Sequence, residues 1–379
     1  MLNPGTTPAG PGPSADLVAS SLTVIRDGQH LSGGYVACPS YPTYRYAWLR
    51  DGAFCAYAMD LHGRAGSADA FHRWVARTVL AHRNLITTAV HVAAAGAVAG
   101  TMPPTRYTLT GEVEADVGAW PNFQLDGYGT WLWALRDHLR RRTHGAAPGG
   151  SVLSGSVLDA AGLVADYLVA TRHLPCFDCW EESGDRRHTS TLAAVSAGLD
   201  AAADLLDRPA LAGVAAELRA DLDARHLRGG CYVKHDATDA VDASLLWLAL
   251  PFGVVAPDDP RMVATAARIR ADLVGPGGGV RRYLGDEFYG GGQWILLTAW
   301  LGWYRAVTGD RAGARSCRDW IDRAATGEGW LPEQTSAAPQ DPAAVEHWVR
   351  RWGPVATPLL WSHAMYLVLD HALEPRAAR

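Results

Sequence analysis

The chain has 379 residues, of which 48% are hydrophobic and 19% charged, and its formal net charge is −5 at pH 7. The apolar fraction is too high for a disordered chain, and the slight acidic excess excludes a broad basic surface for nucleic acid or an anionic membrane. The 15 Trp and 13 Tyr, against only 6 Phe, suit either a groove for hydroxyl-rich ligands or a large core, because both side chains combine a flat apolar face with a polar group.

Residues 1–14 are rich in Pro, Gly and Thr, and we expect a flexible N-terminal tail there. This segment has neither the positive charge nor the apolar stretch of a secretory signal. The longest apolar stretch, residues 85–100, is too short to span a membrane. These features predict a cytoplasmic protein that does not contact the membrane.

Helical periodicity dominates the remainder, residues 15–379. We predict about twelve helices, at residues 15–28, 51–64, 67–92, 126–142, 152–172, 189–206, 209–226, 241–251, 259–273, 290–308, 311–325 and 356–373.

In the second half of the chain, two kinds of helix alternate. Helix 241–251 is apolar nearly all round, which is typical of a buried helix, whereas 209–226 and 259–273 carry Arg and Asp on one face only. Six inner helices surrounded by six outer ones constitute an (α/α)6 barrel, so we predict an all-α fold in a single domain. No strong internal repeat is present, which disfavours a regular solenoid.

Clusters of polar and aromatic residues precede every second predicted helix. They occupy residues 44–51, 120–127, 178–184, 236–242, 281–289 and 330–334. Because the N-termini of alternate helices lie at the same end of an up-and-down barrel, these six clusters are predicted to converge on one mouth.

A mouth lined by Trp, Tyr, Arg and carboxylates suits a sugar, since aromatic faces stack on pyranose rings while charged groups pair with hydroxyls. Hydrolysis of a glycosidic bond needs two carboxyl groups, for which Glu181, Glu182 and Glu333 are the candidates. Each feature also has a purely structural explanation. Arg50 and Asp51 fit a helix cap, the Glu181–Glu182 pair fits a first helical turn, and the tryptophans fit a core.

Other chemistries receive little support. Cys176 and Cys179 form a CxxC motif, but no second CxxC exists, so we expect ordinary reduced cysteines. The 14 histidines include no HExxH motif. Lys234 is the only lysine and follows no Gly-rich phosphate loop, which disfavours nucleotide, Schiff-base and pyridoxal chemistry. We therefore expect neither a metal nor an organic cofactor.

The chain resembles glycoside hydrolase family 15, the inverting glucoamylases and related glucodextranases, isomalto-oligosaccharide glucohydrolases and trehalases. The resemblance covers about residues 41–370 and is carried by six motifs in the same order: YRYAWLRD (44–51), the DG of QLDG (124–127), the WEE of CWEESG (179–184), RRY with YGGGQW (281–294), PEQ (332–334) and PLLWSHA (358–364).

The resemblance implies an (α/α)6 barrel and assigns roles to matching positions. Glu181 corresponds to the general acid and Glu333 to the general base, while Arg50 and Asp51 correspond to the pair that holds the non-reducing-end glucose. The other implied site residues are Tyr41, Tyr44 and Trp48 in the pocket wall, Trp120 beside the acid, Trp180, Glu182 and Arg282 around the first two subsites, Trp361 near the base, and Gln124 and Asp126 in the QLDG motif.

This likeness predicts an exo-acting, inverting α-glucosidase that releases β-glucose from short α-glucans. We expect α-1,6 substrates such as isomaltose first, α-1,4 substrates next and trehalose third, because a chain without an export signal or a starch-binding module would meet short imported sugars. A non-catalytic sugar-binding barrel is the alternative of another class. A terpene-cyclase-like barrel, suggested by Gly-Gly-Gln-Trp at 291–294, lacks its aromatic repeats and acidic motif. The oligomeric state stays open.

Overall fold

The structure is a computed structural model that describes residues 17–97, 102–113, 120, 122–145 and 155–374. The tail expected at residues 1–14 lies outside these residues. The described α-helices are α1 (Leu17–Asp27), α2 (Leu49–Leu61), α3 (Ala65–Ala81), α4 (Arg83–Ala94), α5 (Asp126–Gly145), α6 (Gly155–Thr171), α7 (Thr189–Leu205), α8 (Ala210–Arg225), α9 (Pro260–Leu273), α10 (Ile295–Val307), α11 (Arg311–Ala324), α12 (Pro342–Trp352) and α13 (Leu360–Leu373).

Short elements connect these helices. They are the 3-10 helices η1 (Pro42–Tyr44), η3 (Ala243–Leu248) and η4 (Phe288–Gly290), and the strands β1 (Ala47–Trp48), β2 (Arg106–Tyr107), β3 (Leu227–Arg228), β4 (Cys231–Tyr232), β5 (Gln293–Trp294) and β6 (Gln334–Thr335). The strands form three antiparallel pairs, β1–β2, β3–β4 and β5–β6.

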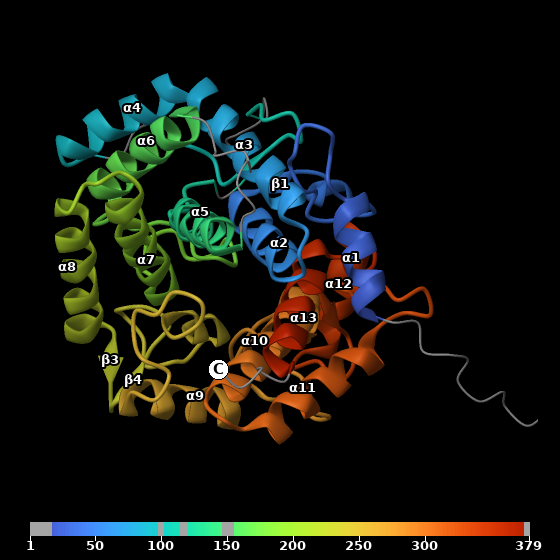
Figure 1. Ribbon diagram of the computed structural model, residues 1–379. Helices are drawn as coiled ribbons and strands as arrows, with labels where there is room; N and C mark the ends of the chain where they lie inside the picture. Colours follow the sequence, from blue (N-terminus) through green and yellow to red (C-terminus); the bar gives the residue numbers. More distant parts are fainter. Residues whose placement is uncertain (1–16, 98–101, 114–119, 121, 146–154, 375–379) are drawn as a thin grey trace, which may run out of the picture.

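The inner elements of the described chain form a closed ring. Contacts run from α2 to α5, α7, η3, α10 and α13, and from α13 back to α2. Figure 1 shows this ring viewed along its axis. Around the outside of the ring lie α3, α4, α6, α8, α9, α11 and α1. The predicted all-α (α/α)6 barrel is confirmed.

The inner and outer helices differ in burial as their compositions predict. All residues of α10 from Ile295 to Tyr304 are buried. In the outer helix α11, by contrast, only Ala314, Cys317, Trp320 and Ile321 are buried, and the Arg and Asp residues lie on the other face. Burial of apolar surface thus decides which helices face the barrel axis.

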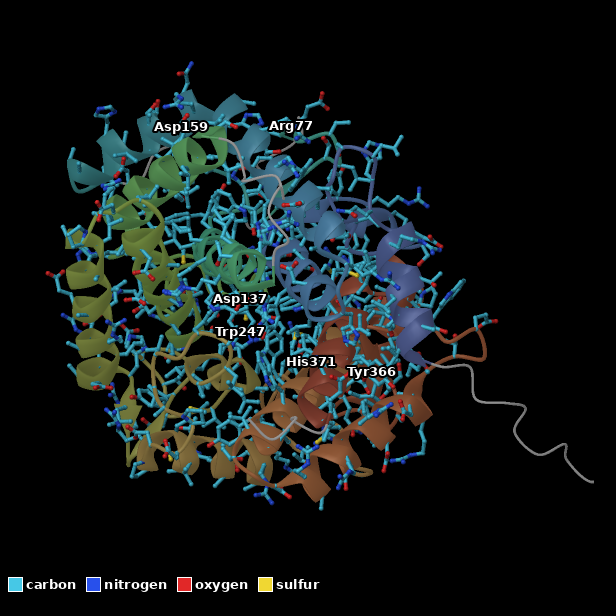
Figure 2. The ribbon with its side chains drawn as sticks, in the orientation of Figure 1. Arg77, Asp137, Asp159, Trp247, Tyr366 and His371 are labelled. Atoms are coloured by element: carbon cyan, nitrogen blue, oxygen red, sulfur yellow. The ribbon has the colours of Figure 1, made fainter. Side chains whose placement is uncertain are left out.

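Aromatic rings from four inner elements fill the barrel axis. Phe54 of α2 stacks on Trp361 of α13 at 5.7 Å between ring centroids and forms a T-shaped contact with Trp300 of α10 at 4.9 Å. Trp247 of η3 lies 5.3 Å from Trp300, and Figure 2 shows it inside the ring of helices. The barrel is therefore a packed core below its mouth and not a channel.

Two predicted helices differ from the observed ones. Residues 67–92 form α3 and α4, which are separated at His82, where the backbone leaves the helical region. His82 stacks on Tyr107 and its Nε2 lies 2.9 Å from the carbonyl oxygen of Gly111. Helix 290–308 begins only at Ile295, because Gly290 and Gly291 adopt left-handed conformations and residues 293–294 form β5.

Two further differences concern the second half. The segment 241–251 contains a 3-10 helix, η3, in place of the predicted α-helix, and Asp242 caps it by accepting from the Ser244 amide. Helix α12 is not among the predicted helices. This helix begins with an Asp341 cap followed by Pro342 at its first position, a signal that could have revealed it.

The six cysteines form no disulfide bond with one another. None of the described helices is both long and apolar enough to cross a membrane.

A buried histidine connects inner and outer helices at the C-terminal end of α2. His138 of α5 has its Nδ1 2.7 Å from Oδ2 of Asp60 in α2 and its Nε2 3.0 Å from Oδ1 of Asp69 in α3. Burial alone would lower the pKa of His138, but the hydrogen bonds and charges of the two carboxylates outweigh it and raise the pKa above 6.5. The imidazolium form is thus favoured by folding.

We expect His138→Asn to destabilise the fold more at low pH than at high pH. A histidine with a raised pKa contributes stability that is complete below pH 6.5 and disappears as pH rises through its folded-state pKa. The charge-assisted bonds are worth about 1.5–3 kcal/mol each at most. Melting temperatures of both proteins at pH 5.5 and pH 9 test this, and an equal difference at the two pH values would contradict it.

Candidate active site

A cavity of about 730 Å³ opens at the end of the barrel where the inner helices begin. The sequence-predicted residues that line it are Tyr41, Tyr44, Trp48, Arg50, Asp51, Trp120, Trp180, Glu181, Glu182, Arg282, Glu333 and Trp361. The motifs do converge on one mouth, with one exception. The cluster at residues 236–242 does not line the cavity, and only its buried end approaches the wall, where Asp242 accepts a hydrogen bond from Trp180 Nε1.

Backbone pairing places two of the pocket segments. In β1–β2, Trp48 is opposite Arg106, and α2 starts directly after Trp48. In β5–β6, Trp294 is opposite Gln334, and the Ile295 amide donates to the Glu333 carbonyl oxygen at 3.2 Å. Each strand pair thus holds pocket residues beside the N-terminus of an inner helix.

A tight turn carries Glu181. Asp178 Oδ1 accepts the backbone N–H groups of Trp180 and Glu182, both at 2.9 Å, and the Glu181 amide donates to the Asp178 carbonyl oxygen. Glu181 has a φ of 69°, a left-handed conformation that is uncommon and costly for a residue other than glycine. The turn therefore holds Glu181 in an unfavourable backbone conformation, and this conformation sets the direction of its side chain.

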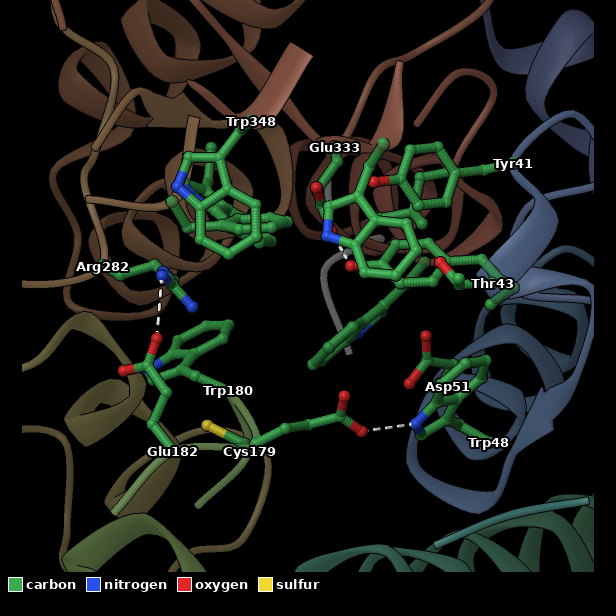
Figure 3. Close-up of a pocket in the computed structure, with 18 of the residues that line it drawn as sticks. Tyr41, Thr43, Trp48, Asp51, Cys179, Trp180, Glu182, Arg282, Glu333 and Trp348 are labelled. Carbon is green, nitrogen blue, oxygen red and sulfur yellow. Dashed lines mark hydrogen bonds and ion pairs between the residues drawn. The ribbon is translucent and has the colours of Figure 1, made fainter. Parts of the chain in front are cut away.

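The carboxylate of Glu181 is held through one oxygen. Oε1 accepts Trp48 Nε1 at 2.7 Å, drawn as a dashed line in Figure 3, and Gln124 Nε2 at 3.1 Å. Its other oxygen, Oε2, has no hydrogen-bond partner among the described residues. Glu181 thus has a fixed orientation and one oxygen available for a ligand.

Glu333 is almost completely buried at the pocket wall. Its Oε1 accepts the Tyr44 hydroxyl at 3.2 Å, whereas Oε2 has no hydrogen-bond partner among the described residues. Burial raises the pKa of Glu333 to about 8, against the lowering effects of the Arg282 charge and the Tyr44 hydrogen bond. A carboxylate in this environment is a stronger base than one in water.

Two aromatic side chains connect the carboxylates. Tyr44, which bonds Glu333, meets Trp48, which bonds Glu181, at 5.7 Å between ring centroids in an edge-on contact. Trp120 in turn meets Trp48 at 6.1 Å. The separation of Glu181 and Glu333 is therefore set by packed rings.

Arg50 and Asp51 form a charged corner. Arg50 Nη1 donates to Gln124 Oε1 and Asp126 Oδ2, each at 2.9 Å, and its Nε lies 3.7 Å from Asp51 Oδ2. Arg50 Nε and Asp51 Oδ2 have no hydrogen-bond partners among the described residues. Both side chains line the cavity, so the guanidinium and the carboxylate can pair with adjacent hydroxyl groups of a sugar.

Gln124 and Asp126, predicted as substrate-binding residues, do not line the cavity. Both side chains are completely buried behind the wall. They hold Arg50, and Gln124 also holds Glu181. The predicted direct contact with substrate is therefore wrong for both residues, because each supports a pocket residue from behind the wall.

A second charged group lies across the pocket. Arg282 binds Asp286 through two hydrogen bonds and forms an ion pair with Glu182 Oε1 at 3.1 Å, which Figure 3 shows. Its guanidinium lies between 5.2 and 5.5 Å from the rings of Trp180, Tyr283, Phe288 and Trp294. Tyr41, also at the wall, bonds the Tyr289 hydroxyl.

Several lining residues are not among the predicted site residues. Arg106 lies 3.7 Å over the Trp120 ring and 4.4 Å over Tyr46, and its position opposite Trp48 depends on strand pairing that no local pattern reveals. The others include residues of α12 at the rim, Trp348, Arg351 and Trp352. The Asp341–Pro342 cap would have indicated a helix there.

In the part of the chain that the structure describes, no group of three or more His, Cys, Asp or Glu side chains could hold a metal ion. The cavity instead combines an aromatic wall with the carboxylates of Glu181 and Glu333, each of which has one oxygen without a hydrogen-bond partner among the described residues. This combination suits acid–base chemistry on a carbohydrate, and with the barrel fold it defines a glycoside hydrolase.

Comparison with known proteins specifies the family. Residues 15–352 match glycosyl hydrolases family 15, and the chain belongs to this family of inverting enzymes.

Individual relatives agree with this membership. An isomaltose glucohydrolase of Kribbella flavida is 42% identical over 96% of this chain and 94% of its own length. A variant glycosidase solved in complex with glucose has a TM-score of 0.87 and 40% identity, over 94% of this chain and 96% of that one. A bacterial glucoamylase complexed with acarbose, 20% identical with a TM-score of 0.72 over 94% of this chain and 55% of that one, shows the fold alone.

We expect Asp51→Asn to stabilise the fold while impairing hydrolysis. Burial raises the pKa of Asp51 to about 7, against the attraction of Arg50, so the cost of ionising Asp51 counts against folding increasingly as pH rises above about 3.9, its unfolded-state pKa, and is complete above about pH 7. Asparagine removes that penalty but also a charged acceptor for a sugar hydroxyl, worth about 1.5–3 kcal/mol. The variant should melt several degrees higher than the wild type at pH 8 but not near pH 3.5, with kcat/KM lowered roughly 10- to 100-fold. A lower melting temperature at pH 8 would contradict this assignment.

Proposed function

We propose that the protein hydrolyses the α-1,6 bond of isomaltose and short isomalto-oligosaccharides from the non-reducing end and releases β-glucose. The observation that carries the proposal is that Glu181 and Glu333 line one pocket, each with an oxygen that has no partner among the described residues. The 42% identical relative named isomaltose glucohydrolase supports the α-1,6 linkage.

The shape of the pocket supports action on chain ends. Trp361 lines the cavity and also packs in the aromatic cluster with Phe54 and Trp300. Phe54, Trp247 and Trp300 beneath it are completely buried. A sugar chain that enters the mouth therefore meets this cluster after a short distance, which suits a terminal glucose.

In the proposed mechanism, Glu181 donates a proton to the departing glycosidic oxygen through Oε2. Glu333 accepts a proton from the water that attacks the anomeric carbon from the opposite face, while the C–O bond to the leaving sugar breaks. The product is β-glucose by inversion. Inverting enzymes separate their two carboxyl groups by about 6.5–9.5 Å so that the water fits between.

The remaining residues hold the substrate. The Arg50 guanidinium and the Asp51 carboxylate bind hydroxyls of the terminal glucose, with Tyr44 and Trp48 as the adjoining wall. Trp180, Glu182 and Arg282, on the other side of the pocket, contact the second sugar.

Trehalose is the second candidate substrate, since a trehalase of Mycobacterium tuberculosis is 26% identical over 75% of this chain, although the match covers only 44% of that enzyme. Hydrolysis of either disaccharide would use the same two carboxylates, so the preference of the enzyme between isomaltose and trehalose depends on how the second sugar is bound.

The test is a proton NMR time course of the anomeric signals with isomaltose, maltose and trehalose in separate samples. We expect β-glucose to appear first and fastest from isomaltose. Glu333→Gln and Glu181→Gln should each lower kcat by roughly 10²- to 10⁴-fold, the usual contribution of a general acid or base. Glu217→Gln, at an exposed position of α8, is the matched control. Early α-glucose would refute inversion, and intact isomaltose beside consumed trehalose would refute the linkage.

The pH profile gives a second test through Tyr44. The base must be ionised, so kcat/KM rises with pH as Glu333 loses its proton. The Tyr44 hydrogen bond lowers the pKa that burial raises, and Tyr44→Phe should therefore move the acidic limb of kcat/KM upward by about one pH unit. Tyr41→Phe is the matched control, because the Tyr41 hydroxyl bonds Tyr289. An unmoved limb in Tyr44→Phe would exclude Glu333 as the group that controls it.

A further inference from the structure

The only lysine of the chain lies directly behind the pocket wall. The Lys234 side chain is 12% exposed, and its Nζ lies 3.3 Å from Asp242 Oδ2, 3.4 Å from Asp178 Oδ2 and 3.9 Å from Glu182 Oε2. The ammonium also lies 3.5 Å from the centre of the Tyr283 ring. One cation thus meets three carboxylates that belong to two distant segments.

The backbone fixes the position of this lysine. Its amide donates to the Ala240 carbonyl oxygen at 2.8 Å, and its carbonyl oxygen accepts the amide of Thr189, the first residue of α7. Lys234 is therefore attached to the inner helix that follows the Glu181 turn, and its side chain reaches back towards that turn.

Each of the three carboxylates holds a part of the pocket. Asp178 accepts the amides of Trp180 and Glu182 and so shapes the turn that carries Glu181. Asp242 accepts Trp180 Nε1 at 2.9 Å. Glu182 accepts the Tyr283 hydroxyl at 2.5 Å and pairs with Arg282.

These carboxylates need a counterion. Asp178 and Asp242 are 2% and 1% exposed, and Asp178 Oδ2 has no hydrogen bond among the described residues. Arg282 binds Asp286 and Glu182, and His188 Nδ1 is 4.0 Å from Asp178 Oδ2. Buried carboxylates without a close cation destabilise their surroundings, so Lys234 is the group that makes this arrangement of two aspartates tenable.

We propose that Lys234 is a positioning residue for proton donation, whose ammonium holds Asp178, Asp242 and Glu182 so that the 178–182 turn presents Glu181 to the departing glycosidic oxygen. This inference rests on the proposed function, because it needs Glu181 as the proton donor.

The test compares two substrates that differ in their need for an acid. Isomaltose loses a sugar alkoxide that must be protonated, whereas α-glucosyl fluoride loses fluoride, which needs little help, while water attack and the base are shared. Lys234→Met should lower kcat on isomaltose roughly 10- to 100-fold and kcat on α-glucosyl fluoride less than about threefold. Glu181→Gln should show the same asymmetry, and Lys234→Arg, which retains the charge, should lose less than Lys234→Met on isomaltose.

Arg261→Met is the matched control, since Arg261 in α9 also pairs with two carboxylates, Asp259 and Asp223, outside the pocket. It should leave both rates unchanged. Equal losses on the two substrates in Lys234→Met would reduce the lysine to a general structural role, and unchanged kcat on isomaltose would overturn the proposal outright. If Lys234→Met does not fold, the double variant Lys234→Met/Asp242→Asn removes one charge of each sign and retains the acceptor for Trp180. The loss of kcat on isomaltose relative to that on α-glucosyl fluoride then tests the proposal in the double variant.

A spectroscopic measurement tests the ion cluster without any substrate. Labelling lysine with ¹³C at Cε yields one signal in this chain. Burial alone would lower the pKa of Lys234, but the charges of Asp242, Asp178 and Glu182 outweigh it and raise the pKa above 10.5. The signal should therefore not titrate below pH 10.5 in the wild type, and titration below that value would refute the cluster.

If wild-type protein leaves isomaltose intact, the proposed substrate fails, and the kcat ratio is measured with the disaccharide that is consumed.

Discussion

The aromatic packing along the barrel axis is the constraint on which the rest of the structure depends. Phe54, Trp247, Trp300 and Trp361 come from four different inner elements and contact one another in the centre of the ring. Burying four such side chains stabilises the closed ring, since aromatic residues remove the largest apolar areas from water. The same cluster ends the cavity from below, so the core that closes the barrel also limits the depth of the pocket.

Above this core, the stability of the site depends on how its buried charges are balanced. The pocket wall contains carboxylates that folding disfavours in their ionised form, as the raised pKa values of Asp51 and Glu333 indicate. Arginines anchored by further buried acids balance part of this charge, and Asp178 and Asp242 are balanced by a lysine. Burying these charges at the mouth of the barrel is thus electrostatically unfavourable. The apolar core of the barrel offsets this cost.

Much of this organisation could be predicted from the sequence because the inner and outer helices differ in composition. The motif positions before alternate helices then implied a common mouth, and twelve predicted residues line the cavity. Local patterns failed where distant contacts decide conformation. His82 ends α3 where it meets Tyr107, and Arg106 reaches the pocket because β2 pairs with β1. Helix α12 was missed although its Asp341–Pro342 cap was readable.

The sequence by itself determined the class of fold, the order of the motifs and the residue types at the mouth, because helical periodicity and side-chain chemistry are local properties. Only the tertiary structure decided which of these residues face the cavity and which support them. Gln124 and Asp126 share a motif with pocket residues yet lie behind the wall, and Lys234 acquires its three carboxylate neighbours only when α7 and η3 pack together. Such assignments depend on contacts between residues far apart in the chain, which no local pattern encodes.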